Sequence, residues 1–269
     1  MTLTCEFTGN QLNFDTSPQR IVSLSSGFTE ALFELGLSSK VVGVSEYCPR
    51  YCDCDKLPRA GWYLNADFQV IAELQPDLIL MTSGIQLRFA KLLASQGLPV
   101  YVLPLPTSVG GIYENLVRLG GLVGATEQAR ELVFQMEHRL HSIRNNAPSF
   151  PSLYAEAWFG VHGRMIGGLS FIQDILWYSG SQPLFMDCSW SYERLDLIQV
   201  EKLQPQIFVG FHEPEHHVDF IQQSMERGWE KAFKPKVILS TVEKGKNIIH
   251  DGPSLVDTVA WLSEQIHSA

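Results

Sequence analysis

The sequence predicts an α/β fold made of two Rossmann-like lobes, each with a parallel sheet, joined by a single long helix. Three observations predict it. Short apolar runs alternate with helical segments, a helix–Leu-Gln-Pro–strand segment occurs twice, and a long amphipathic segment lies between the two copies. Strands that are apolar throughout and alternate with helices are typical of a parallel sheet covered on both faces. We expect an N-terminal lobe over residues 1–125, a linking helix over 126–146 and a C-terminal lobe over 147–269.

The first lobe contains four apolar runs bounded by turn residues. They predict strands over Arg20–Ser25, Lys40–Ser45, Asp77–Met81 and Pro99–Leu103. Helical segments between them are predicted over Glu30–Leu35, Asp67–Leu74 and Ile85–Gln96. The first of these is expected to begin after Thr29 as its cap, with Ser26-Gly27-Phe28 forming a turn.

The two halves of the chain share an internal repeat. Val70–Met81 reads VIAELQPDLILM and Gln199–Gly210 reads QVEKLQPQIFVG, and both predict a helix, Leu-Gln-Pro, and a strand. Two lobes of related architecture follow from this match.

A 20-residue segment, Thr126–Asn145, separates the lobes. It predicts one continuous helix of about 30 Å, because a rise of about 1.5 Å per residue applies. The apolar residues on one face of this helix are Ala129, Leu132, Val133, Met136, Leu140 and Ile143.

Composition restricts the function. The chain has 269 residues, of which 45% are hydrophobic and 18% charged, and a formal net charge of −9. These values are those of an ordinary globular protein, and the acidic balance argues against nucleic-acid binding. The first fifteen residues lack the basic and apolar regions of a secretory signal, so we expect a cytoplasmic protein. The alternative is a periplasmic or cell-surface protein from which a leader was removed.

Five cysteines, an odd number, favour free thiols. Cys48, Cys52 and Cys54 form a cluster whose spacing is not that of a zinc finger. A soft-metal or redox role and a disulfide remain open for this cluster.

Several motifs taken in order resemble a known family. They are Arg20–Gly36 (RIVSLSSGFTEALFELG), Val41–Cys48 (VVGVSEYC), the two Leu-Gln-Pro segments, and Asp251–Asp257 (DGPSLVD). Together they resemble the helical-backbone class of substrate-binding proteins of ABC importers, and within it the cobalamin-binding branch. The resemblance implies binding of a corrinoid (vitamin B12-like) ligand in a cleft between the lobes, by a component of an ABC importer or a relative of one. It implies a monomer that binds a small molecule, with no required cofactor, no catalysis and no nucleic acid.

Two other interpretations stay open. The same fold could serve haem, a ferric siderophore or a metal ion, and a protein of another class would be a two-lobed enzyme or metal chaperone. The sequence offers no nucleophile with a paired base and no phosphate-binding loop, so catalysis has no positive support.

Transport proteins of this class usually carry a glutamate in each lobe that docks on permease arginines. Gln69 and Ile198 stand at those positions, and neither side chain can form the ion pair. Asp67 and Asp196, which are equivalent under the repeat, are the nearby acidic residues that could replace them.

Ligands of open α/β sheets bind beyond the carboxyl ends of the strands. Aromatic residues are frequent in the loops predicted there, and a corrin or porphyrin offers a wide, flat, mostly apolar face to such side chains. The predicted ligand-binding residues are Ser26, Phe28, Tyr47, Trp62, Tyr63, Ser83, Trp158, Phe159, His162, Trp190, Tyr192, Phe211 and His212. Trp62 and Trp190 stand in polar turns and are expected to be exposed.

The segment His212–His217 (HEPEHH) follows a predicted strand over Gln206–Phe211. Imidazole and carboxylate groups bind zinc and iron, and a neutral imidazole can occupy an axial position on haem iron or corrin cobalt. His212 is therefore the candidate metal ligand, with His216, His217 and His162 as weaker ones. The alternative for each is a solvated loop residue.

Overall fold

The computed structural model describes residues 2–62, 65–160, 162–215, 218–229 and 234–268. The chain forms two compact units, each discontinuous in sequence. Unit 1 comprises Met1–Pro106, Ile112–Gln135 and Asp251–Pro253, and unit 2 comprises Thr107–Gly111, Met136–His250 and Ser254–Ala269. Each unit contains helices on a mainly parallel sheet, which confirms the predicted fold class. The three-part division with a linking segment over 126–146 remains a proposal.

Unit 1 contains a six-stranded sheet with the order β6-β5-β4-β3-β7-β8. These strands are β3 (Ile21–Ser23), β4 (Val41–Ser45), β5 (Arg59–Trp62), β6 (Asn65–Ala66), β7 (Leu78–Thr82) and β8 (Val100–Leu103). The strands β5, β4, β3, β7 and β8 pair in parallel in that order, and β6 pairs with β5 in the antiparallel sense. The chain winds outward from β3 in both directions, so the point where strand order reverses lies between β3 and β7.

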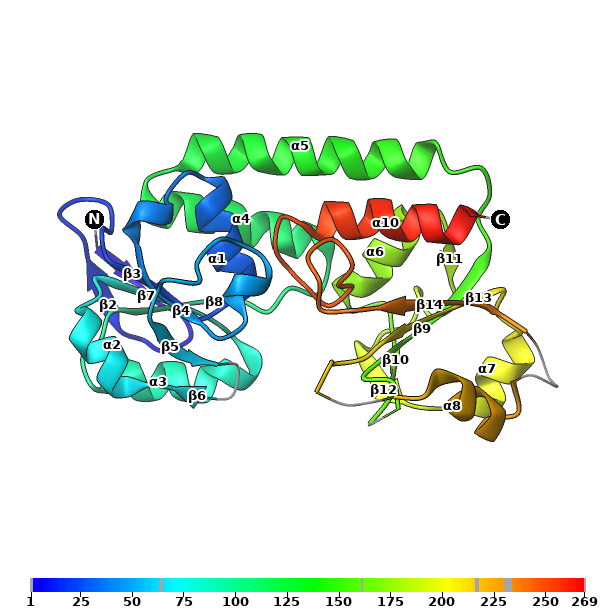
Figure 1. Ribbon diagram of the computed structural model, residues 1–269. Coiled ribbons are helices and arrows are strands. Elements are labelled where there is room, and N and C mark those ends of the chain that lie inside the picture. The colour runs from blue at the N-terminus through cyan, green and yellow to red at the C-terminus, as the bar shows by residue number, and fades with distance from the viewer. Residues whose placement is uncertain (1, 63–64, 161, 216–217, 230–233, 269) are drawn as a thin grey trace. The chain divides into compact units, whose positions relative to one another are not determined.

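Helices cover both faces of this sheet. Figure 1 shows α2 (Phe68–Leu74) and α3 (Leu87–Ser95) on one face, and α1 (Ser26–Glu34) and α4 (Val109–Val123) on the other. Short 3-10 helices η1 (Ser38–Lys40), η2 (Cys48–Arg50) and η3 (Gly84–Gln86) occupy connections. The doubly covered sheet explains why its strands are apolar throughout.

Helix α1 corrects one prediction. It begins at Ser26, with Ser25 in the extended N-cap position, and not at Glu30. Thr29 lies inside the first turn, where its hydroxyl donates to the Ser25 carbonyl at 2.9 Å and contacts the Ser23 hydroxyl at 2.8 Å. The segment that we expected to be a turn is therefore helical, because its only glycine, Gly27, is the second residue of the helix and does not interrupt it.

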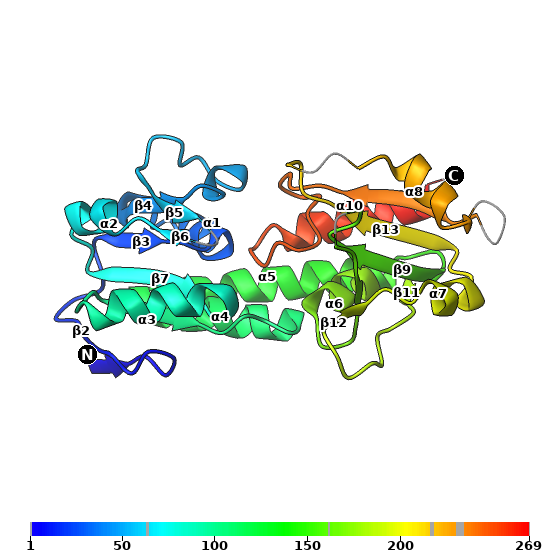
Figure 2. The same ribbon diagram turned by 90° about the horizontal axis from the view of Figure 1, so that it is seen from below.

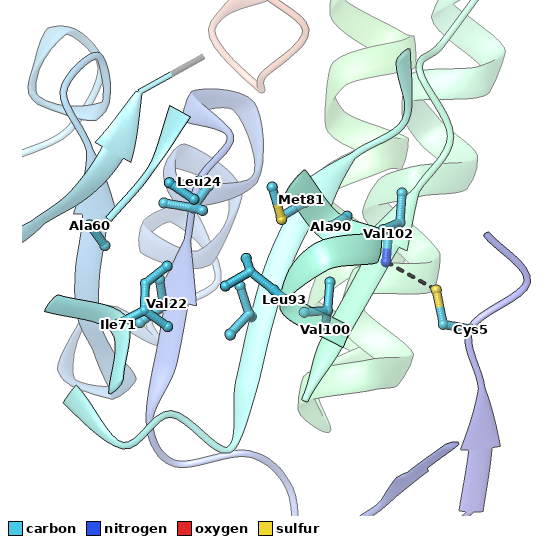
Figure 3. Close-up of a cluster of buried hydrophobic side chains, with 12 residues drawn as sticks. Cys5, Val22, Leu24, Ala60, Ile71, Met81, Ala90, Leu93, Val100 and Val102 are labelled. Atoms are coloured by element: carbon cyan, nitrogen blue, oxygen red, sulfur yellow. Dashed lines mark hydrogen bonds between the residues drawn. The ribbon is translucent and has the colours of Figure 1, made fainter. Parts of the chain in front are cut away.

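The core of unit 1 lies between its sheet and α2 and α3. Buried side chains from β3, β7 and α3, among them Val22, Met81 and Leu93, pack there with Leu24, which follows β3 (Figure 3). Unit 1 also contains an N-terminal hairpin of β1 (Thr2–Thr4) and β2 (Gln11–Asn13), which pair in the antiparallel sense (Figure 2). The buried Cys5 sulfur of the hairpin connection accepts a hydrogen bond from Val102 N at 3.4 Å, which ties the hairpin to β8.

Unit 2 contains a sheet with the order β12-β10-β9-β13-β14, with β11 also paired to β9. The strands are β9 (Ser152–Ala157), β10 (Arg164–Ile166), β11 (Gln182–Pro183), β12 (Tyr192–Arg194), β13 (Ile207–Phe211) and β14 (Lys236–Ser240). Strands β11, β9, β13 and β14 pair in parallel, whereas β10 pairs with β9 and β12 in the antiparallel sense. The sheet is thus mixed and not purely parallel. The antiparallel strands β10 and β12 form one edge, and each has three residues and no apolar run.

Helices also lie on both faces of the sheet of unit 2. Figure 1 shows α6 (Phe171–Tyr178) and α10 (Leu255–His267) on one face, and α7 (Leu197–Leu203) and α8 (Phe220–Glu226) on the other. Tyr154, Phe159, Phe208 and Trp229 form an aromatic core in this unit, with ring centroids 5.0 to 5.8 Å apart between the pairs in contact.

The internal repeat is visible in the backbone. Asp67 caps α2 by accepting from Val70 N at 3.0 Å, and Asp196 caps α7 by accepting from Gln199 N at 2.9 Å. Both helices end on a glutamine in the left-handed region, Gln75 with φ 44° and Gln204 with φ 43°. The proline that follows cannot continue a helix, so both copies turn directly into a buried strand.

Helix α5 spans Thr126–Asn145, as predicted, and appears in Figure 1 as one uninterrupted helix. Near its C-terminal end Arg144 donates to the carbonyls of Trp177 and Ser181, both at 2.8 Å. The guanidinium also lies 3.9 Å from the ring centroid of Phe150 and 4.4 Å from that of Trp177. These contacts fix the end of α5 to the C-terminal end of α6.

The start of α4 is held by a side chain from another helix. Asp174 of α6 accepts a hydrogen bond from Val109 N at 2.7 Å. Burial raises the pKa of the Asp174 carboxyl, and the hydrogen bond from Val109 N lowers it in part. Asp174 therefore supplies one N-terminal acceptor for α4, in addition to the Ser108 hydroxyl, which accepts from Gly111 N at 3.0 Å.

Candidate functional site

The carboxyl ends of β9 and β13 are adjacent in unit 2, because these strands pair in parallel. Trp158 follows β9 and His212 follows β13. Phe159 N donates to Phe211 O at 2.9 Å, so the contact between the two chain segments continues beyond the end of β9. The sheet thus brings two of the predicted ligand-binding loops together at one edge, where open α/β sheets bind ligands.

Trp158 has φ 52°, in the left-handed region. A bulky residue rarely adopts this conformation, which costs on the order of 1–3 kcal/mol and occurs mainly at functional sites. The turn keeps the Trp158 side chain only half-buried, while the next side chain, that of Phe159, enters the core. The strain therefore presents an indole at the carboxyl edge of the sheet.

Two further rings extend the Trp158 surface. The His162 imidazole stacks on the indole with centroids 5.7 Å apart and an interplanar angle of 19°. The centroid of the Tyr192 ring of β12 lies 5.5 Å from that of the Trp158 indole, with an interplanar angle of 50°, and Tyr192 is 39% exposed. We call Trp158, His162 and Tyr192 the aromatic platform.

A buried ion pair lies under the loop that carries the platform. Arg227 Nη1 lies 2.7 Å from Glu156 Oε2, and Arg227 Nη2 lies 3.1 Å from Glu156 Oε1. Glu156 is 0% exposed and Arg227 8%. The guanidinium also lies 4.7 Å from the Phe159 ring centroid. A Cβ at Gly163 would collide with the Glu156 carboxylate, so the loop passes directly over the pair.

The same carboxylate reaches a third group. Tyr154 OH lies 3.3 Å from Glu156 Oε2. Burial, followed by the Glu156 charge, raises the pKa of the Tyr154 hydroxyl well above its usual value, so it remains a neutral donor. The bidentate pair with this extra hydrogen bond rigidifies the base of the platform.

Other predicted residues of unit 2 have packing roles. Phe159 and Phe211 are 1% and 0% exposed, so they offer no ligand surface and leave the proposed set. Trp190 was expected to be exposed but is half-buried, because its indole packs on Phe185 and fills the space above Gly167. His212 is half-buried, and its Nδ1 lies 3.3 Å from Glu213 O.

Unit 1 presents a smaller set. Trp62 at the end of β5 is 41% exposed, as predicted. The Tyr47 ring is half-buried, with the Arg50 guanidinium 4.6 Å from its centroid. Ser26 begins α1, and the Ser83 hydroxyl accepts from Leu105 N at 2.7 Å. Phe28 is buried and is therefore no longer proposed as a ligand-binding residue, and Tyr63 lies outside the described residues.

Apolar side chains that sequence reasoning missed lie near these loops. Ile85 in η3 and Leu105 after β8 are exposed in unit 1, and Leu169 is exposed in unit 2, where its backbone bonds to that of Trp190. The signal for them was available, because each is an apolar residue that follows closely on a strand end. Two arginines, Arg164 and Arg194, were also missed, and only the strand pairing places them near Tyr192.

The cysteines are free in the structure. The Cys48 sulfur is buried 3.1 Å from the hydroxyls of both Thr29 and Ser45. Burial is the largest cause that raises the pKa of Cys48, Cys52 and Cys54, and neighbouring thiols raise that of Cys52 further. Protonated thiols are weak nucleophiles and metal ligands. Cys48 and Cys54 are buried, whereas Cys52 is half-buried.

The described part of the chain contains no group of three His, Cys, Asp or Glu side chains arranged to hold a metal ion. His212 thus belongs to no such group there, while His216 and His217 lie outside the described residues. At the positions of the docking glutamates, Gln69 Nε2 donates to Glu73 Oε1 at 3.0 Å and Ile198 is 69% exposed. Asp67 and Asp196 are engaged as helix caps.

Two units with doubly covered, mainly parallel sheets, one of them bearing an aromatic platform at its strand ends, define the architecture of a two-unit α/β protein. The chain belongs to the periplasmic binding protein family, which it matches over residues 21–239. This confirms the family expected from the sequence motifs. Within the described residues no helix combines the length and apolar character needed to cross a membrane.

Curated relatives with similar sequences include a cobalamin-binding protein of Halobacterium salinarum, 23% identical over 203 residues, or 74% of this chain. The chain spans about half the length of that relative, 55%. A vitamin B12-binding protein of Yersinia pestis is 25% identical over 193 residues, covering 71% of this chain and 69% of the relative.

Solved structures share the fold. A possible iron-binding periplasmic solute-binding protein of Staphylococcus epidermidis superimposes with a TM-score of 0.80 at 22% identity, covering 94% of this chain and all of its own. A periplasmic haem-binding protein of Pseudomonas aeruginosa gives 0.73 at 19%, covering 92% of each chain. A periplasmic vitamin B12-binding protein of Vibrio cholerae gives 0.71 at 21%, covering 93% of this chain and 97% of its own.

Proposed function

We propose that this chain binds a corrinoid, a vitamin B12-like macrocycle, and does so without catalysing a reaction. The aromatic platform of unit 2 carries the proposal, because a strained tryptophan held half-exposed by a rigid base suits contact with a flat ligand face. Sequence relatives that bind cobalamin or vitamin B12 support the choice of ligand.

The remaining proposed contacts come from the strand-end loops of both units. They are Ser26, Tyr47, Trp62, Tyr63, Ser83, Trp190 and His212, in addition to the platform. Haem is the second candidate ligand, favoured by the fold shared with a haem-binding protein and by the exposed imidazole of His162, which could reach a macrocycle metal.

As the partner of such a binder, we propose an ABC permease, which the family supports. Because Gln69 and Ile198 cannot pair with permease arginines, docking would use other charges. Asp67 and Asp196 occupy equivalent places in the two units and keep one carboxylate oxygen each beyond the capping bond. We also propose that the protein acts as a monomer.

The compartment is part of the proposal. Five free cysteines, three of them close together, suit a reducing compartment such as the cytoplasm. Titration of protein isolated and denatured without reductant should find all five thiols. A count of three or fewer would show a disulfide and place the chain in an oxidising compartment, as the periplasmic description of the family suggests.

Replacing Trp158 tests the platform. Trp158→Ala should weaken cyanocobalamin binding about 5- to 150-fold, because loss of a central aromatic contact costs about 1–3 kcal/mol. Titration followed by intrinsic fluorescence or calorimetry measures the change. Phe134→Ala, which removes an exposed aromatic side chain from α5, is the control and should leave the affinity unchanged.

Trp158→Gly separates conformation from binding. Both variants lack the indole, so their affinities should be equally low. Glycine adopts φ 52° without strain, so Trp158→Gly should be more stable than Trp158→Ala by about 1 kcal/mol. Wild-type affinity in both variants would contradict the proposal that the aromatic platform contacts the ligand.

A further inference from the structure

Two arginines face each other beside the aromatic platform. Arg164 of β10 and Arg194 of β12 are directly opposite in the antiparallel pairing, which also sets Ile166 opposite Tyr192. Side chains of directly opposed residues lie on the same face of a sheet, with Cβ atoms about 4.5–5.5 Å apart. Tyr192 precedes Arg194 by two residues and shares its face. The arginine pair and the platform therefore lie on one surface.

The register of the sheet directs the acidic side chains of the neighbouring strands β9 and β12 to the other face. On β9 the residue opposite Arg164 is Ala157, while Glu156 is opposite Met165 and points to the other face, toward Arg227. On β12 Glu193 also points to the other face, and its carboxylate accepts from Arg194 N at 2.8 Å. Within the described residues neither Arg164 nor Arg194 forms an ion pair.

The two guanidinium groups retain donors. Arg164 uses Nη1 for the carbonyls of His162 and Gly163, both at 3.0 Å, which ties it to the platform loop and leaves its other N–H groups available. Arg194 is exposed, and its side chain makes no hydrogen bond within the described residues. Like charges in directly opposed positions destabilise a sheet, and an anion between them would remove this cost.

We propose that Arg164 and Arg194 form an anion subsite for an acidic group at the edge of the ligand whose flat face lies on the platform. The inference rests on the proposed function and makes it more specific. The group is an anionic oxygen function that a planar arginine fork binds in bidentate fashion. In a complete corrinoid it is the phosphodiester of the nucleotide loop, and in haem it would be a propionate.

Two corrinoids separate the subsite from the platform. Cyanocobalamin carries the phosphodiester, whereas dicyanocobinamide has the corrin ring without it. Arg194→Met should weaken cyanocobalamin binding about tenfold or more, as expected for loss of a charge-assisted hydrogen bond, and leave dicyanocobinamide binding within about twofold. Arg164→Met should do the same, although loss of its bonds to the platform loop adds a smaller effect on both ligands.

Two controls accompany the variants. Arg130→Met removes an exposed arginine from α5 and changes the net charge equally, and it should change neither affinity. Arg194→Lys keeps the charge but not the fork, and should fall between wild type and Arg194→Met. Raising the salt concentration should weaken cyanocobalamin binding by the wild type more than by Arg194→Met, because the ion pair is screened.

The results decide the two claims separately. If Arg194→Met weakens both corrinoids equally, or neither, the subsite is wrong while corrinoid binding stands. If the wild type binds neither corrinoid, the proposed function fails, and haemin is compared with its dimethyl ester. Selective loss of haemin binding in Arg194→Met would then support the subsite with a carboxylate ligand, and equal or no change in the two would overturn it.

Discussion

Arg227→Met should lower the free energy of unfolding by about 3–5 kcal/mol, because it leaves the Glu156 carboxylate buried without its counter-charge. The loss should be this large because Glu156 is 0% exposed and lies on the central strand β9, where water cannot replace the guanidinium. Arg227 also packs against Phe159 and Trp229, with its Cζ 4.7 and 5.0 Å from their ring centroids. Urea unfolding at neutral pH measures the change through its midpoint and slope.

A double variant distinguishes the charge from the packing. Glu156→Gln with Arg227→Met removes both charges, so most of the lost stability should return, since a neutral replacement of a buried pair is often tolerated. Arg20→Met is the control, because it removes an exposed arginine that bonds to the carbonyls of Leu74 and Gln75 and should cost much less. A loss under 1 kcal/mol in Arg227→Met would contradict the buried pair described above.

Met136→Pro should cost at least about 3 kcal/mol of unfolding free energy. Proline removes the amide hydrogen bond to the carbonyl four residues earlier and collides with that carbonyl. Met136 is buried in the middle of the continuous helix α5, so the break cannot move to an end. Thermal and chemical denaturation followed by circular dichroism measure the loss.

Two matched variants locate the cause of that loss. Met136→Leu conserves volume and should cost less than about 1.5 kcal/mol. Glu127→Pro puts proline in the first turn of the same helix, where the amide has no helical acceptor, and should be tolerated. Equal costs for Met136→Pro and Glu127→Pro would mean that the segment is not a continuous helix.

Regular elements were predictable where the sequence pattern is long or repeated. The bounds of α5 follow from its apolar face and from the glycine and asparagines that flank it. The buried strands β7 and β13 were predicted because each follows Leu-Gln-Pro and is apolar throughout. In contrast, β10 and β12 have three residues each and no apolar run, so the antiparallel edge of unit 2 was not foreseen.

The candidate site was predictable in its residue types more than in its geometry. The sequence singled out Trp62, Trp158 and Tyr192 as aromatic residues at or beside strand ends, and the structure places all three there with partly or largely exposed side chains. The left-handed backbone at Trp158 determines that its indole, and not the Phe159 ring, stays accessible, and a local pattern does not reveal this. Arg164 and Arg194 are 30 residues apart and meet only through strand register.

Equilibrium dialysis of the wild-type protein against cyanocobalamin and against haemin tests the central claim most directly, because each ligand is quantified by its own absorbance. We expect one cyanocobalamin bound per chain with a dissociation constant of about 1 µM or lower, and haemin bound at least about tenfold more weakly. Retention of haemin with no retention of cyanocobalamin at about 100 µM would contradict the corrinoid assignment.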